Sequence, residues 1–355
     1  MTVTQADALP HDHRQDRRAR ARRAHLWLGL CLVLTCAISL ETGASGVSLW
    51  SVMSAGAADT PVQGIILWEV RLPRVLLGVL VGAALAVSGT VMQGLFRNPL
   101  ADPGIVGVSA GAGLGAVTAI VLGSLLPIAL RDSLGPFLVP VAAFLGGWAS
   151  VLLLYGVATR GGRTSVATML LAGIALGALS GAVSGLMVYA ADDQQLRDLT
   201  FWGLGSLAGA TWAKVATAAP ILLMAMAGAM TLGRGLNGLA FGEATALHLG
   251  IPVQRVKTLA ILAVAAATGG AVAVSGGIGF IGIVVPHLLR LATGPDHGPL
   301  LVNAALLGAS LLLGADIVSR VIIAPAELPI GIVTAVVGAP VFLWILLRQR
   351  PMGDF

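Results

Sequence analysis

The sequence predicts an all-α integral membrane protein with about ten transmembrane helices and an inverted-topology repeat. Of its 355 residues, 57% are hydrophobic and 10% are charged, against about 25% charged in a typical soluble domain. A chain with a mean hydropathy of +0.92 cannot cover a water-facing surface with polar side chains. Lipid admits only helices and closed barrels, and the long apolar runs do not alternate, so helices are favoured over a barrel.

Ten apolar segments succeed one another along the chain, most of them long enough to cross a bilayer. Their ranges are 26–42, 73–96, 104–126, 137–157, 166–190, 212–232, 258–276, 279–292, 300–319 and 329–347. The eighth is short and nearly abuts the seventh. The tetrapeptide AVSG occurs at 86–89 and again at 273–276, which predicts repeat halves of about 73–190 and 258–347 with opposite orientation.

The distribution of basic residues predicts the topology. Six arginines in HRQDRRARARRAH precede the first apolar segment, giving a basic cytoplasmic tail over 1–25 and a single transmembrane domain over 26–350. With ten spans, fifteen Lys and Arg lie inside and six outside, the bias expected when both termini are cytoplasmic. A signal peptide cleaved near TGASG is the alternative to an uncleaved first helix. The basic residues therefore point to membrane topology and not to nucleic-acid binding.

Glycine recurs every fourth residue in the fifth apolar segment, at Gly173, Gly177, Gly181 and Gly185. These positions form one stripe on a helix, where another backbone can approach closely or a bulky solute can pass. Helix packing within the chain is one interpretation, and a translocation pathway or dimer face is the other. Met187 lies near the outer end of the same segment, where it could either pack or contact cargo.

Residues 236–257 are too polar to span a membrane and too long for a simple turn. GEATALHLG reads as a short helix ended by Gly250, with Pro252 beyond it. Such a helix on the cytoplasmic side either docks a soluble partner or is an interfacial loop.

Arg71 and Arg74 in RLPR and Arg320 in ADIVSR fall at the outer rim of the predicted bundle. Arginines there suit carboxylates on a soluble partner, or they anchor helices by snorkelling. Asp316 is the one acid placed within an apolar span, which makes it a functional candidate, but a pair with Arg320 at i,i+4 is the simpler explanation.

The stretch RNPLADPG, 97–104, interrupts the apolar sequence. Asn98-Pro99 and Asp102-Pro103 break the helix, because a residue before proline avoids the α region. Asp102 can cap the following helix with Pro103 at its first position. We expect a tight inside turn with Arg97 at the cytoplasmic interface, and we infer that it contributes to the surface that meets a cytoplasmic partner.

The catalytic motifs that would indicate an enzyme are absent. The sequence contains no G-x-x-x-x-G-K-[ST] phosphate loop, G-x-S-x-G, H-E-x-x-H or C-x-x-C. It also lacks a series of intramembrane acids that would couple transport to protons. We therefore expect no catalytic residues and no metal or cofactor bound by this chain, and a secondary transporter is the less favoured function.

The segments RLPRVLLGVLVGAALAVSGTVMQGLFRNPLADPGIVGVSAGA, GGIGFIGIVVPHLLRLATGPDH and ADIVSR…AELPIGIVTAVVGAPVFLWIL resemble permease subunits of the iron-siderophore, haem and vitamin B12 class of ABC importers, the type II importers. The resemblance runs from about Leu49 to Leu347. It implies a homodimer with a pathway along its axis, two ATPase subunits that bind ATP and Mg on the cytoplasmic face, and a periplasmic binding protein that delivers the substrate.

The same resemblance assigns roles to individual residues. Arg71, Arg74 and Arg320 resemble the arginines that grip acidic residues of the binding protein, and the glycine-rich fifth helix resembles the one that lines the pathway. FGEATALHLGI resembles the motif that couples to the ATPase, which here comprises Gly242, Glu243, Ala244, Ala246, Leu249 and Gly250. DDQQLRDLTFWGLGSL and MQGLFRNPLADPG look most like haem permeases, so haem is the expected substrate, with a ferric siderophore or cobalamin as alternatives.

Overall fold

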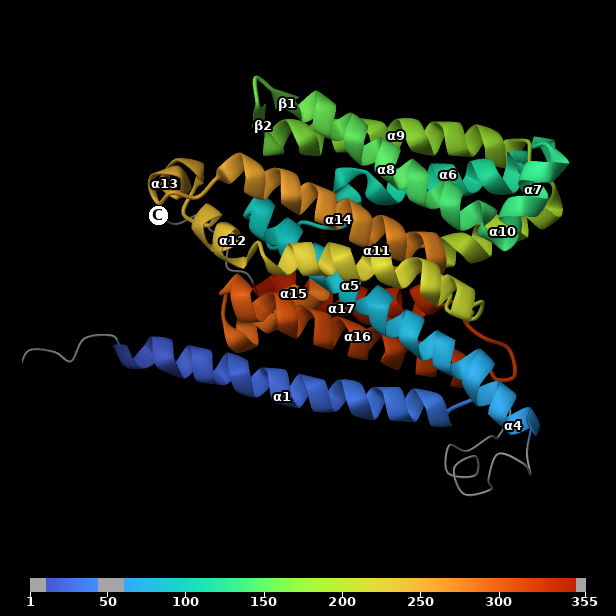
Figure 1. The fold of residues 1–355 in the computed structure, drawn as a ribbon, viewed down its shortest axis with the longest axis horizontal. Helices are drawn as coiled ribbons and strands as arrows, with labels where there is room; N and C mark the ends of the chain where they lie inside the picture. Colours follow the sequence, from blue (N-terminus) through green and yellow to red (C-terminus); the bar gives the residue numbers. More distant parts are fainter. Residues whose placement is uncertain (1–10, 44–60, 349–355) are drawn as a thin grey trace, which may run out of the picture.

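The computed structural model describes residues 11–43 and 61–348, and apart from one short β-hairpin its regular structure is helical (Figure 1). The helices and strands, including the short π- and 3₁₀-helices η1–η4, are α1 His11–Glu41, α4 Pro61–Ile65, η1 Ile66–Arg71, α5 Leu72–Phe96, η2 Pro103–Val106, α6 Val108–Leu122, η3 Gly123–Leu125, α7 Ile128–Leu134, η4 Gly135–Phe137, α8 Leu138–Ala158, β1 Thr159–Arg160, β2 Arg163–Thr164, α9 Val166–Tyr189, α10 Asp193–Leu204, α11 Trp212–Met230, α12 Gly233–Leu239, α13 Glu243–His248, α14 Val253–Ser275, α15 Ile281–Thr293, α16 His297–Val321 and α17 Ile330–Arg348.

The prediction of about ten spans is confirmed. Within the described residues, eight helices are long and apolar enough to cross a membrane, and the shorter apolar helices α15 and α17 match the eighth and tenth predicted segments. Helix α1 begins at His11 and continues into the first span, so the described part of the predicted basic tail is helical. Residues 1–10 of that tail lie outside the described residues.

Side-chain caps explain where several of these helices begin. Asp192 accepts hydrogen bonds from the N–H groups of Gln194 and Gln195, and it forms a capping box at the start of α10. Ser165 caps α9 and Thr211 caps α11 in the same way. Each cap satisfies backbone donors that have no partner within their own helix.

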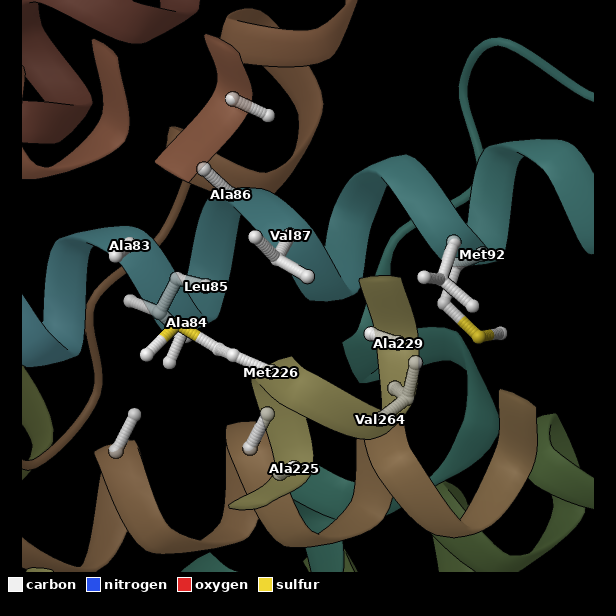
Figure 2. Close-up of a cluster of buried hydrophobic side chains, with 14 of the residues drawn as sticks. Ala83, Ala84, Leu85, Ala86, Val87, Met92, Ala225, Met226, Ala229 and Val264 are labelled. Atoms are coloured by element: carbon white, nitrogen blue, oxygen red, sulfur yellow. The ribbon is translucent and has the colours of Figure 1, made fainter. Parts of the chain in front are cut away.

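Helix α5 is the centre of the bundle. It contacts α16, α14, α15 and α11, and 83% of its most apolar window is buried. Many of its buried side chains are small, and Figure 2 shows Ala84 beside Met226 of α11 and Ala86 on the opposite side of the helix. Small side chains allow neighbouring backbones to come close, which is how helices gain packing energy in lipid.

Helices α5 and α14 run in opposite directions. Arg97, after the end of α5, approaches Gly242 at the start of α13, whereas Gly277, after the end of α14, donates its N–H to the carbonyl of Trp202 in α10. These contacts define two ends of the bundle, the α13 end and the α10 end. Each helix is followed by a non-helical segment and then by a shorter helix, α6 or α15, which is the arrangement of an inverted-topology repeat.

The AVSG tetrapeptide does not mark equivalent positions in the two halves. Residues 86–89 lie inside α5, seven residues before its last residue, whereas 273–276 end α14 and Gly276 already has a positive φ. The order of the helices supports the inverted repeat. The two AVSG copies do not align with each other when α5 is compared with α14.

Gly89 of α5 and Gly282 of α15 form a very close backbone contact between the two halves. A Cβ added at Gly89 would lie 1.8 Å from the Gly282 carbonyl oxygen, which no real Cβ can do. The beginning of α15 is therefore held directly against the middle of α5.

We predict that Gly89→Ala separates α5 from α15 and destabilises the folded protein by at least 1–3 kcal/mol, the cost typical of overpacking. Gly113→Ala in α6 is the matched control, since nothing lies within 4 Å of the added methyl group. Thermal unfolding in detergent measures both variants. Equal unfolding temperatures for the Gly89→Ala and Gly113→Ala variants would contradict the close contact between Gly89 and Gly282.

Candidate functional site

The predicted coupling segment forms a short helix on the surface of the α13 end. Gly242, with φ of 97°, precedes α13, and Gly250, with φ of 76°, follows it, as the sequence predicted. Ala246 is buried and fixes one side of α13, while Ala244 is exposed. Three large apolar side chains stay exposed around this helix, Phe241, Leu247 and Leu249, at 74%, 61% and 64%. Exposed apolar side chains on a short helix suit a protein partner.

Lys257 anchors α13 to the rest of this end, and the sequence analysis missed it. Its Nζ lies 2.7 Å from a carboxylate oxygen of Glu243 and donates to the carbonyl of Thr164 in the β1–β2 hairpin at 2.7 Å. The side chain is 2% exposed. The signal that could have identified Lys257 is its place at the start of an apolar span, because a buried ammonium group there requires a charged or polar partner.

The RNPLADPG stretch begins as predicted and then departs from the prediction. Arg97 ends α5 in the left-handed region, with φ of 51°, and Asp102 caps η2 by accepting the Gly104 N–H at 2.7 Å, with Pro103 at the first position. Ala101 and Pro103 are buried, so the segment does not stay at the surface as a tight turn.

Beyond Asn98, the chain re-enters the bundle. Asp102 lines a cavity of about 330 Å³ together with Gly203 of α10 and Gly282 of α15. Non-helical backbone at this depth is tolerated because it is surrounded by protein.

Arg74 lies in a buried ion-pair cluster at the α10 end. Its guanidinium is 2.8 Å from an oxygen of Asp316, whose side chain is fully buried, and 2.8 Å from an oxygen of Glu327. Arg320 completes the cluster at 3.1 Å from the second Asp316 oxygen, so the predicted i,i+4 pair is confirmed. Asp316 is thus held by two guanidinium groups.

Arg71 and Arg320 also hold the end of α1. Arg71 donates to the carbonyls of Leu40 and Glu41, and Arg320 donates to the carbonyls of Ser39 and Thr42. Cations at a helix C-terminus pair with carbonyls that have no partner within the helix. These bonds join α1 to the start of α5 and the end of α16.

The three arginines do not stand free at an outer rim. Their exposed fractions are 4% for Arg71, 7% for Arg74 and 8% for Arg320, because carboxylates and α1 carbonyls occupy them. The carboxylate of Glu327, whose side chain is 38% exposed, is the accessible charged group of the cluster. Docking of a binding protein on the arginines stays a prediction.

The glycine stripe of α9 faces outward over most of its length. Gly173 is buried, but nothing lies within 4 Å of a Cβ added at Gly177, Gly181 or Gly185. Only 17% of this helix's most apolar window is buried. The stripe therefore does not serve packing within one chain at these three positions.

Met187 does not belong to that open face. Its sulfur lies 3.6 Å from the hydroxyl of Thr118 in α6, so it packs inside the subunit. Among the described residues, no three His, Cys, Asp or Glu side chains gather in a way that could hold a metal ion.

We predict that Arg74→Met destabilises the folded protein by about 3–5 kcal/mol, because it leaves Asp316 buried with one guanidinium partner fewer. Arg131→Met in exposed α7 is the control. Adding Asp316→Asn to Arg74→Met should recover part of the loss. Thermal unfolding of the single and double variants measures the coupling, and strictly additive effects would contradict it.

Comparison with known proteins places this geometry in a family. The chain is 45% identical over 326 residues to the hemin transport system permease protein of Yersinia pestis, covering 92% of this chain and 96% of that protein. It is 41% identical over 336 residues to the vitamin B12 import system permease protein of an Escherichia coli strain, covering 94% and 98%. A solved structure described as an inward-facing conformation of a metal-chelate type ABC transporter has a TM-score of 0.81 at 33% identity, covering 92% of this chain and 100% of that one. The model of the FecCD transport family matches residues 31–348, and the chain belongs to that family.

Proposed function

We propose that the chain is the membrane-spanning subunit of an ATP-driven importer that carries haem into the cytoplasm. The assignment of haem as the substrate rests on the 45% identity to a hemin permease over nearly the full length of both proteins. Cobalamin is the second candidate, because vitamin B12 permeases match at 41% over a similar length. A ferric siderophore is the third.

Two copies of the chain enclose the pathway in this proposal. The support is the α9 face, where Gly177, Gly181 and Gly185 have open space in front of them and no neighbour from the same chain. Exposed backbone at these glycines lets a second α9 approach, or leaves room for a bulky planar solute. High affinity for haem belongs to the binding protein, since a tight site in the pathway would retain the cargo.

Separate ATPase subunits supply the energy. The chain has no phosphate-binding loop, and α13 presents Phe241, Leu247 and Leu249 to solvent on a helix anchored by Lys257. We place the α13 end in the cytoplasm of a bacterial inner membrane, with both termini, because the arginine-rich start of α1 lies at that end (Figure 1). The binding protein then docks at the α10 end, beside Glu327.

The dimer face predicts a cross-link. In a chain whose Cys31 and Cys36 are replaced by serine, Gly181→Cys should form a disulfide-linked dimer under mild oxidation, because the two α9 helices face one another. Gly29→Cys on α1 is the control, since its surroundings are equally open but it lies away from α9. Non-reducing electrophoresis measures the product. Equal cross-linking at both positions would refute a specific α9 interface.

The transport proposal predicts ATP-dependent haem uptake by liposomes that contain this chain, its ATPase and its binding protein. Leu247→Asn combined with Leu249→Asn should reduce uptake at least tenfold by weakening ATPase docking, while Leu125→Asn, at a more exposed leucine of the α10 end, should leave it unchanged. Uptake of cobalamin or a ferric hydroxamate in place of haem would overturn the assignment of haem as the substrate. If none of the three is taken up, the proposal that the chain belongs to an importer is wrong.

A further inference from the structure

A groove between α1 and α15 opens at the α13 end of the bundle and has no part in the proposed transport pathway. Its volume is about 470 Å³, and its lining comprises Arg20, Arg23, Ala24, Trp27, Leu28, Leu288, Leu289, Ala292, Thr293 and Leu307. A second cavity of about 210 Å³ shares Arg20, Ala292 and Thr293 with it and adds Arg290. The two cavities are therefore adjacent, with Arg20 between them.

The groove changes from charged to apolar along α1. Arg20, Arg23 and Trp27 follow at i, i+3 and i+7, so they lie on one helix face. Arg20 and Arg23 precede the apolar part of α1, so in the proposed topology they lie near the membrane surface and Leu28 lies deeper. An indole between a charged and an apolar zone is typical of the membrane interface.

The arginines of the groove have spare capacity to bind an anion. No carboxylate among the described side chains lies within salt-bridge distance of Arg20, Arg23 or Arg290. Arg290 donates to the amide oxygen of Gln93, which orients its guanidinium beside the second cavity. Guanidinium groups bind phosphate with paired N–H donors, so Arg20 and Arg23 in the groove, with Arg290 in the adjoining cavity, suit a phosphate group.

We propose that this groove binds an anionic phospholipid of the surrounding bilayer, with its phosphate on Arg20, Arg23 and Arg290 and one acyl chain along Trp27 and Leu28. The apolar part of the groove continues into the spanning part of α1, where a lipid chain reaches it and a soluble protein does not. Basic pockets between helices on the cytoplasmic side are the usual places for such head groups.

A bound lipid also supplies a neighbour for a helix that has few. Only 6% of the most apolar window of α1 is buried, and at this end α1 is held to α16 by the 2.5 Å bond between His25 and Asn303. The α1 side of the site, Arg20, Arg23 and Trp27, lies before residue 31, where the family match begins. The α15 side of the site, including Arg290, lies within the matched range.

Native mass spectrometry of the delipidated full-length chain, titrated with palmitoyl-oleoyl phosphatidylglycerol or phosphatidylcholine, tests the proposal. Arg23→Gln should weaken phosphatidylglycerol binding about fivefold and Arg20→Gln with Arg23→Gln about 25-fold, the factors expected for one and two arginines near a bilayer surface. Arg22→Gln is the matched control, because Arg22 is exposed on the same turn and lines neither cavity. It should change binding less than twofold.

Trp27→Ala probes the apolar half without a change of charge, and Trp27 is 71% exposed, so the variant should fold. It should weaken phosphatidylglycerol binding, and phosphatidylcholine should not saturate the wild-type site. Equal losses in Arg22→Gln and Arg23→Gln would overturn the site in favour of general attraction to basic residues. Displacement of the lipid by millimolar inorganic phosphate would overturn the lipid as occupant in favour of a free anion.

Discussion

Close contact between backbones around α5 is the constraint on which the rest of the structure depends. Lipid provides no hydrophobic force that drives apolar helices together, so packing distance decides which helices associate. Gly82 of α5 lies against the backbone of Gly308 in α16, and Gly89 lies against Gly282 in α15. A Cβ added at Gly82, Gly89 or Gly308 would clash with the opposing backbone, so these positions need glycine. The contacts fix α5 between the two halves of the repeat and set the positions of the other helices.

This arrangement also determines where polar groups can lie. The Asp316 carboxylate is fully buried at the α10 end, where Arg74 and Arg320 reach it from two adjacent helices. The non-helical stretch before α6 enters the interior only because α15 and α14 surround it. In both places the protein replaces the water that a charged or unpaired group would otherwise need. The guanidinium groups therefore bind within the subunit first, which limits what they offer to a partner.

The sequence predicted the local features and missed the long-range ones. Hydropathy located the ten apolar segments, and cap residues such as Asp102 and Gly250 acted as the pattern indicated, because each depends on neighbours within a few residues. The pairing of Arg74 with Glu327 spans 253 positions and has no local trace. The same holds for Arg320 and the carbonyl of Thr42, so the sequence placed the arginines correctly at one end but could not show their burial.

The contrast between α5 and α9 bears on how a transporter of this fold moves. Helices that touch backbone to backbone cannot slide without clashes at Gly89 or Gly82, so α5, α15 and α16 behave as one packed unit. Helix α9 has no such contact at Gly177, Gly181 and Gly185. Its outward face is free to change its neighbours at low cost in packing energy. This contrast supports the proposal that a pathway opening alternately to the two sides lies on the α9 face, while the glycine contacts of α5 hold each subunit together.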